Sequence, residues 1–133
     1  MLSTNKLLVI STLLLTSLSF GAEFEYKCEV LKVFSLTEDS YLSGTNWDKM
    51  MAGSEFTVSK ETGEIVGKVV PTINATDYGV SNHGDSEWSF KSLATFNNEV
   101  IQILEIKEFL STPIKPSISI SMRGAGLVTE VCR

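Results

Sequence analysis

Alternation of apolar and polar residues with a period of two is the dominant pattern along this chain. Between Phe24 and Val30 every second side chain is apolar and the residues between are charged, which predicts a half-buried strand. The alternation changes parity after Val30, and a β-bulge or a bend near Leu31 would account for that change. The first strand is therefore expected to be long and irregular in its middle.

Further strand signals recur along the chain, separated by short turns. They cover residues 55–60, 64–66, 87–96, 99–110, 117–122 and 127–132. Residues 68–73 are expected to extend the second of these strands, with Pro71 at an edge or a bulge. Gly63 and the pair 97–98 suit hairpin turns, because glycine and asparagine both tolerate positive φ. A glycine-rich turn at 124–126 precedes the last strand.

In two strands the pattern predicts which faces of the strand are buried. In residues 117–122 the alternation is expected to place Ile118, Ile120 and Met122 inward and the three serines outward. The strand 99–110 begins with apolar side chains on both faces, so it is expected to be central or covered on its second face. Whether the chain itself or a second copy covers that face stays open at this point.

Residues 45–53 predict one short helix, which Thr45 or Asn46 can cap at its start and a glycine can end. Three of its apolar side chains share one face, at positions i, i+3 and i+4: Trp47, Met50 and Met51. Such a face could cover a ligand. We favour the interpretation that it plugs one end of the core.

These elements predict an all-β fold, an antiparallel meander closed as a small barrel or sandwich with one short helix. Residues 22–133 contain no linker, internal repeat or low-complexity tract, so we expect a single domain. Strands do not alternate with long helices, which excludes a nucleotide-binding α/β fold.

Residues 1–21 have the pattern of a secretory signal peptide. A short start with Lys6 precedes an apolar run, and small residues stand before a cleavage point at Ala22. A cut just after Ala22 fits nearly as well. The apolar run is too short to span a bilayer comfortably, and no basic cluster follows it. We therefore expect an exported protein, periplasmic or secreted.

Two cysteines, Cys28 and Cys132, stand near the two ends of the expected mature chain. An oxidising compartment favours a disulfide between them. The bridge would require the first and last strands to meet. A redox pair is the alternative, but the spacing lacks the C-x-x-C proximity that such chemistry uses.

Composition narrows the classes of function. The chain of 133 residues has a net charge of -5, which disfavours binding to nucleic acid. Its single histidine and two cysteines cannot form a zinc finger or a multi-histidine site. We expect no metal and no cofactor.

The polar loop 74–85 and the residues after it contain candidate chemistry. His83 could act as a base oriented by Asp85, with a serine of the same loop as nucleophile. Asp77, Asp85 and Glu87 could hold Ca²⁺, although their spacing does not fit an EF-hand. A solvated loop of turn-forming residues explains both patterns, so we expect no enzymatic activity.

Two stretches resemble known families. Tyr26-Lys27-Cys28, the C-terminal Cys132 and the F-x-V-x-[KR]-x-T-G-x-I-x-G segment at 56–67 resemble small, uncharacterised exported bacterial β-barrel proteins. The same frame is distantly similar to periplasmic lysozyme inhibitors. Those inhibitors present a Ser-Gly-x-x-Tyr-like loop to the cleft of the enzyme. Here the nearest string, 43–47, has Trp47 in place of the Tyr, and the later Trp-Trp segment of the inhibitors is missing.

The sequence thus favours a non-enzymatic, exported binding module that engages a protein or another macromolecule of the cell envelope. We expect a monomer that binds through its polar end loops, as an inhibitor does. The expected binding residues are Ser43, Gly44, Trp47, His83 and Asp85.

The alternative function is a carrier of a small apolar ligand or a lipid, of the calycin kind. It needs an apolar interior. The side chains expected to form that interior are Trp88, Phe90, Ile103, Ile106, Ile118 and Ile120.

Overall fold

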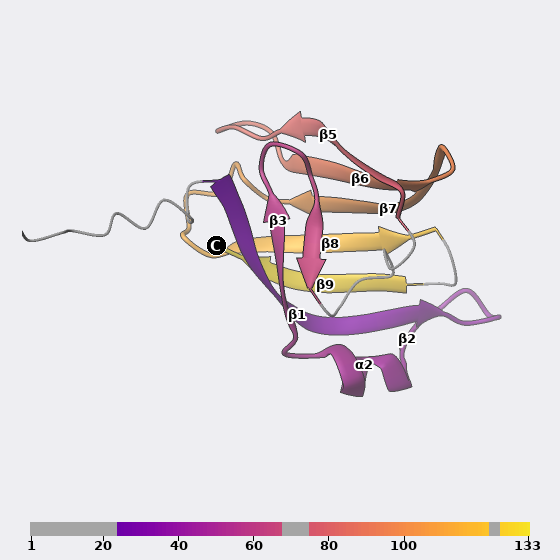
Figure 1. Ribbon diagram of the computed structural model, residues 1–133. Helices are drawn as coiled ribbons and strands as arrows, with labels where there is room; N and C mark the ends of the chain where they lie inside the picture. Colours follow the sequence, from indigo (N-terminus) through magenta and orange to yellow (C-terminus); the bar gives the residue numbers. More distant parts are fainter. Residues whose placement is uncertain (1–23, 68–74, 123–125) are drawn as a thin grey trace, which may run out of the picture.

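The computed structural model describes residues 24–67, 75–122 and 126–133 (Figure 1). The elements in chain order are β1 Glu25–Leu36, β2 Leu42–Gly44, α2 Asn46–Met51, β3 Glu55–Ser59, β4 Ile65–Gly67, β5 Asp77–His83, β6 Phe90–Phe96, β7 Glu99–Ile106, β8 Lys115–Ser121 and β9 Gly126–Cys132. The predicted leader 1–21 and the expected strand 68–73 lie outside the described residues, as does most of the predicted turn 124–126.

All described strands form one antiparallel sheet. Its order is β4-β3-β1-β9-β8-β7-β6-β5, and β2 pairs with β1 beside β3. The sheet curls into a half-barrel, with the β3–β4 hairpin on one face of strands β7–β9 (Figure 1). The prediction of an all-β fold with one short helix is confirmed.

A bulge divides β1 into two parts. The register with β9 shifts between Val30 and Lys32, which leaves Leu31 as the extra residue. The first half of β1 pairs with β3 and the last three residues pair with β2. The predicted irregularity near Leu31 is therefore confirmed, and a bulge of this kind bends the strand and increases its twist.

Among the described residues, the two ends of the half-barrel are not joined by paired strands. Instead, the turn of the β3–β4 hairpin contacts β5 and β6. Gly63, at the turn of the β3–β4 hairpin, has φ +75°. A Cβ placed there would lie 2.9 Å from the carbonyl oxygen of Gly79 and 3.0 Å from the Cβ of Ser92. The hairpin turn thus reaches β5 and β6 so closely that only glycine fits.

The core lies between the β3–β4 hairpin and the rest of the sheet. Its buried side chains are Tyr26, Cys28, Val30, Val33, Phe56, Val58, Ile65, Phe90, Leu104, Ile106, Val128 and Cys132. The rings of Tyr26 and Phe90 pack 5.0 Å apart, centroid to centroid. Side chains from both halves of the chain therefore fill one interior.

The expected orientation of β8 is wrong. Ser117 and Ser119 point inward and are buried, whereas Ile120 and Met122 are 41% and 54% exposed and Ile118 faces outward with them. The inward serines lie beside Glu130 of β9, whose buried carboxylate requires hydrogen-bond donors. The period of two was identified correctly, but it does not say which of the two faces is the inner one.

The polar segment predicted as a loop is partly a strand. Residues 77–83 form β5, the last strand of the sheet, which pairs only with β6 among the described strands. An edge strand tolerates polar residues because one side of it is not enclosed by a neighbour. Two predicted strands are shorter in the structure. The predicted strand 87–96 begins only at Phe90, and the predicted strand 99–110 ends at Ile106.

The disulfide between Cys28 and Cys132 is present, with 4.0 Å between the two Cα atoms. The residues lie directly opposite each other in β1 and β9. Lys27 and Arg133, next to them, exchange two backbone hydrogen bonds of 2.9 Å, so the cysteines occupy a non-hydrogen-bonded pair, where side chains of neighbouring strands lie closest. The prediction that the first and last strands meet is confirmed.

We predict that replacing both cysteines, Cys28→Ala with Cys132→Ala, lowers the free energy of unfolding by about 2–5 kcal/mol, because the bridge closes a loop of nearly the whole domain. Urea denaturation followed by circular dichroism measures the change. Reduction of the wild type should give a similar loss and leave the double variant unaffected. Equal stability of both proteins under oxidising conditions would contradict the prediction.

Candidate functional site

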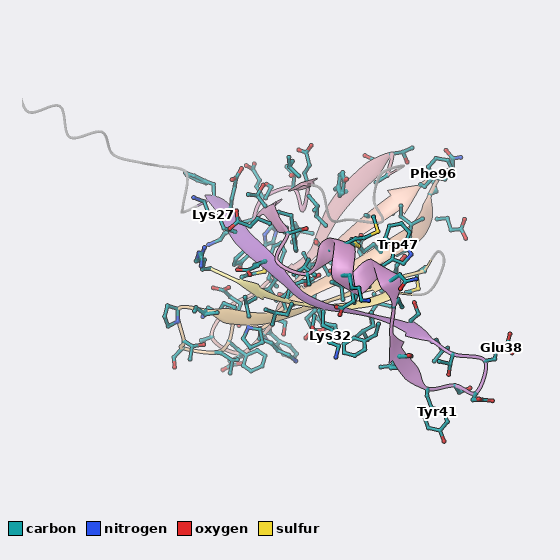
Figure 2. The ribbon with its side chains drawn as sticks, turned by 90° about the horizontal axis from the view of Figure 1, so that it is seen from below. Lys27, Lys32, Glu38, Tyr41, Trp47 and Phe96 are labelled. Atoms are coloured by element: carbon teal, nitrogen blue, oxygen red, sulfur yellow. A yellow bond between two sulfur atoms is a disulfide. The ribbon has the colours of Figure 1, made fainter. Side chains whose placement is uncertain are left out.

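We call the chain segment 36–51 the arm; its hairpin loop and β2 project from one end of the sheet, and α2 lies beside β1 (Figures 1 and 2). It comprises the end of β1, the hairpin loop 37–41, β2 and α2. Three hydrogen bonds hold the loop: Ser40 N to Thr37 O, Thr37 N to Tyr41 O and Tyr41 N to Thr37 Oγ1, at 2.8–3.0 Å. Ser40 has φ 66°, a left-handed conformation that closes the turn. The tip is therefore ordered by its own hydrogen bonds.

Large apolar side chains on the arm face solvent. They are Leu36, Tyr41, Leu42, Trp47 and Met50, each more than half exposed. Figure 2 shows Tyr41 and Glu38 at the tip, away from the body of the sheet. Ser43 and Gly44 lie in β2 of the same arm and are exposed, and the Ser43 hydroxyl donates a hydrogen bond to the neighbouring Gly44 carbonyl. Three of the five predicted binding residues thus lie together.

The helix is held by polar contacts rather than by burial of its apolar face. Thr45 caps α2, since its Oγ1 accepts a hydrogen bond from Trp47 N. Asp48 Oδ1 accepts a hydrogen bond of 3.0 Å from the backbone N of Val33, just beyond the bulge in β1. Met51 packs against the core.

The expectation that Trp47, Met50 and Met51 together plug the core is wrong for the first two, which are 61% and 72% exposed. The bulge and Asp48 fix the helix beside β1 so that only its last residue reaches inside. The predicted cap and the predicted position of the helix are confirmed.

His83 and Asp85 lie at the opposite end of the sheet. His83 pairs with Phe90, in the row of Ile106 and Ser117, whereas β2 pairs with the far end of β1. The structure therefore does not bring the two predicted groups of binding residues together.

Each of these two residues has a local partner. His83 Nδ1 lies 3.2 Å from the carbonyl oxygen of Lys60, at the end of the β3–β4 hairpin. Asp85 Oδ1 accepts hydrogen bonds from the backbone N of Glu87 and of Trp88, at 2.8 and 2.9 Å. Asp85 thus builds the turn that precedes β6. Trp88, expected to point inward, is 61% exposed on that turn.

Glu130 is a buried acidic residue that sequence reasoning missed. Its side chain is 3% exposed, and its two oxygens accept hydrogen bonds from Ser117 Oγ at 2.8 Å and Ser119 Oγ at 2.6 Å. Burial raises the pKa of Glu130 to about 7, although the two serine hydroxyls oppose the shift. The alternation of serines in 117–122 was visible in the sequence, but nothing there linked it to an acid.

The side chains expected to line a carrier cavity do not share one interior. Phe90 and Ile106 are buried in the core, whereas Ile103, Ile118 and Ile120 face outward from the sheet. Trp88 is exposed.

A groove of about 400 Å³ lies on the outer side of the sheet, near the disulfide. Among its lining residues, Glu29 and Glu55 lie directly opposite each other, and Lys27 and Arg133 stand beside them. The groove is lined by charged side chains of both signs and by apolar side chains, among them Phe56, Val66 and Ile114.

Within the part of the chain that the structure describes, no three histidine, cysteine or acidic side chains gather where they could hold a metal ion. No helix in these ranges is long and apolar enough to cross a bilayer. Comparison with known proteins finds no matching family model, no matching curated protein and no matching solved structure.

We predict that Glu130→Gln removes a loss of stability that the wild type suffers as the pH rises. Because the folded state holds the Glu130 proton more tightly than the unfolded state does, the wild type is most stable below about pH 4.5 with respect to this group. It loses that contribution as the pH rises through about 7. The loss amounts to about 3 kcal/mol, so the variant should be more stable than the wild type at pH 8.

Urea denaturation at pH 5 and pH 8 measures the difference between the two proteins. Glu55→Gln, which removes an exposed carboxylate from the surface, controls for the change in net charge. A difference between Glu130→Gln and the wild type that is the same at both pH values would exclude a raised pKa.

Proposed function

We propose that this protein is an exported, non-enzymatic binding module that engages a protein of the cell envelope through the arm. The observation that carries the proposal is the set of five large exposed apolar side chains on a hairpin and helix that are ordered by their own hydrogen bonds. Aromatic side chains and methionine are enriched at protein interfaces. An ordered tip loses little conformational entropy on binding. Ser43, Gly44 and Trp47 are the binding residues that this proposal retains.

The acidic residues at the tip of the arm favour a partner with positive charge. Glu38 and Asp39 stand beside Leu36 and Tyr41, and neither forms an ion pair with another described residue. The whole chain has a net charge of -5. A partner with a basic cleft fits these charges, since complementary potentials accelerate association and suppress wrong partners. A basic lysozyme is therefore the first purified probe, in keeping with the resemblance to lysozyme inhibitors.

The disulfide and the pattern of the leader support the part of the proposal that concerns export. Disulfides persist in oxidising compartments such as the periplasm, and the chain has no free cysteine among its described residues. The apolar run of residues 7–18 has the length and flanks of a signal peptide.

We predict that Trp47→Ala weakens binding to the partner at least ~10-fold, because a buried aromatic anchor contributes about 2 kcal/mol or more at an interface. Trp88→Ala is the matched control, since Trp88 is also 61% exposed but lies at the other end of the sheet. Inhibition of a basic lysozyme, and capture from envelope extract of the native host, compare the three proteins. The arm is not the binding site if Trp47→Ala retains every interaction of the wild type.

We also predict that the protein recovered from its native host begins at Ala22, or one residue later, and resides outside the cytoplasm. Intact-mass measurement after cell fractionation tests this. A full-length chain in the cytoplasmic fraction, with reduced cysteines, would refute export.

A further inference from the structure

The groove near the disulfide, which we call the charged groove, lies over the first part of β1, between β3 and β9. Its volume of about 400 Å³ is in the range of pockets that hold small ligands. Four charged side chains line it: Lys27, Glu29, Glu55 and Arg133. None of the four forms an ion pair or a side-chain hydrogen bond with another described residue. The groove therefore presents charges of both signs that the described part of the chain leaves unpaired.

The four charges form two pairs of like sign. Glu29 and Glu55 lie directly opposite each other on β1 and β3. Lys27 and Arg133 are neighbours at the β1–β9 ladder, where they exchange two backbone hydrogen bonds of 2.9 Å. Like charges directly across two strands destabilise the sheet. A ligand that brings an ammonium group to the two carboxylates and a carboxylate to the two cations relieves both repulsions.

The spacing of the two pairs indicates the length of such a ligand. Lys27 and Glu29 are two residues apart on one face of β1, so the pairs are separated by about 7 Å along the strand. The two charged termini of a dipeptide lie at nearly this separation, because two extended residues span at most about 7 Å. A free amino acid, with a single residue between its charges, spans only about half of that length.

Apolar side chains lie on both sides of the charges. Val66 of β4 pairs with Thr57, which pairs in turn with Lys27. Val131 of β9 pairs with Glu29 from the other side of β1. Both valines line the groove, and Val66 is 61% exposed. Successive side chains of an extended peptide point in opposite directions, so an apolar dipeptide places one side chain towards Val131 and the next towards Val66.

We propose that the charged groove binds a zwitterionic dipeptide with apolar side chains. Glu29 and Glu55 hold its ammonium group. Lys27 and Arg133 hold its carboxylate. Hydrogen bonds between charged groups are shorter and stronger than those between neutral groups. The two cations and two anions of the groove sum to zero charge, which matches a ligand without net charge. The inference goes beyond the proposed function, because Figure 2 shows Lys27 well away from Trp47 of the arm.

Isothermal titration calorimetry of the mature, oxidised protein tests the inference, with the dipeptide leucyl-leucine as the probe. The wild type should bind this dipeptide saturably at millimolar concentration. N-acetylation removes the ammonium group of the probe, and C-terminal amidation removes its carboxylate. Each change should weaken binding at least ~10-fold, because it removes hydrogen bonds between charged groups. Equal binding of the three peptides, or no binding of leucyl-leucine at millimolar concentration, overturns the inference.

Glu29→Gln with Glu55→Gln removes the charge of the anionic pair and keeps side chains of nearly the same shape. This double variant should bind leucyl-leucine at least ~10-fold more weakly and should no longer distinguish it from the N-acetylated form. Because the change also removes a repulsion, the variant should be at least as stable as the wild type. Glu61→Gln with Glu64→Gln is the matched control, since both glutamates are exposed on the β3–β4 turn, outside the groove. An equal effect of the two double variants refutes the site.

The groove and the arm are tested separately. Trp47→Ala should bind leucyl-leucine as the wild type does, and the double variant of Glu29 and Glu55 should retain every interaction of the arm. Loss of dipeptide binding in Trp47→Ala would place the dipeptide at the arm and contradict the groove. Failure of the arm to bind a protein leaves the dipeptide measurement unaffected.

Discussion

Pairing between the first and the last strand holds the two parts of this sheet together. β1 lies between β3 and β9, so the N-terminal hairpins and the C-terminal meander of β5–β9 belong to one sheet only through the β1–β9 ladder. The Cys28–Cys132 bridge ties that ladder at one end. The bulge at Leu31 then turns β1, so that its first part can carry β3 and its last part can carry β2. The curl of the half-barrel and the position of the arm both depend on this strand.

The buried acid of β9 decides which face of the neighbouring strand β8 points inward. Glu130 points inward from β9, and an unpartnered buried carboxyl would be costly. Ser117 and Ser119 of β8 supply the two hydrogen bonds, and this orientation turns the isoleucines of the same strand to the outer face. The buried acid and the outward isoleucines of β8 are thus two consequences of which face of that strand points inward.

The arm and the outer face of the C-terminal strands are separate surfaces with different structural origins. The arm exposes Trp47 and Met50 because Asp48 anchors the helix to the backbone of β1 and leaves only Met51 to reach the core. Ile120 is exposed on the outer face because β8 carries apolar side chains there and, among the described residues, only the inner face is covered. The residues at the other end of the sheet, His83 and Asp85, have local partners that position the β3–β4 hairpin and the turn before β6.

The sequence by itself determined the features that depend on neighbouring residues: the alternation that makes strands, the loss of parity at Leu31, the cap of the helix at Thr45 and the turn at Gly63. It also determined that Cys28 and Cys132 could pair, since only two cysteines exist. The tertiary structure decided which face of β8 points inward, which side chains of the helix stay exposed, and that residues 77–83 form a strand. It decided as well that Ser43 and Trp47 lie far from His83. These outcomes depend on partners distant in the sequence, such as Glu130 for Ser119 and β6 for β5, and a local pattern contains no information about such partners.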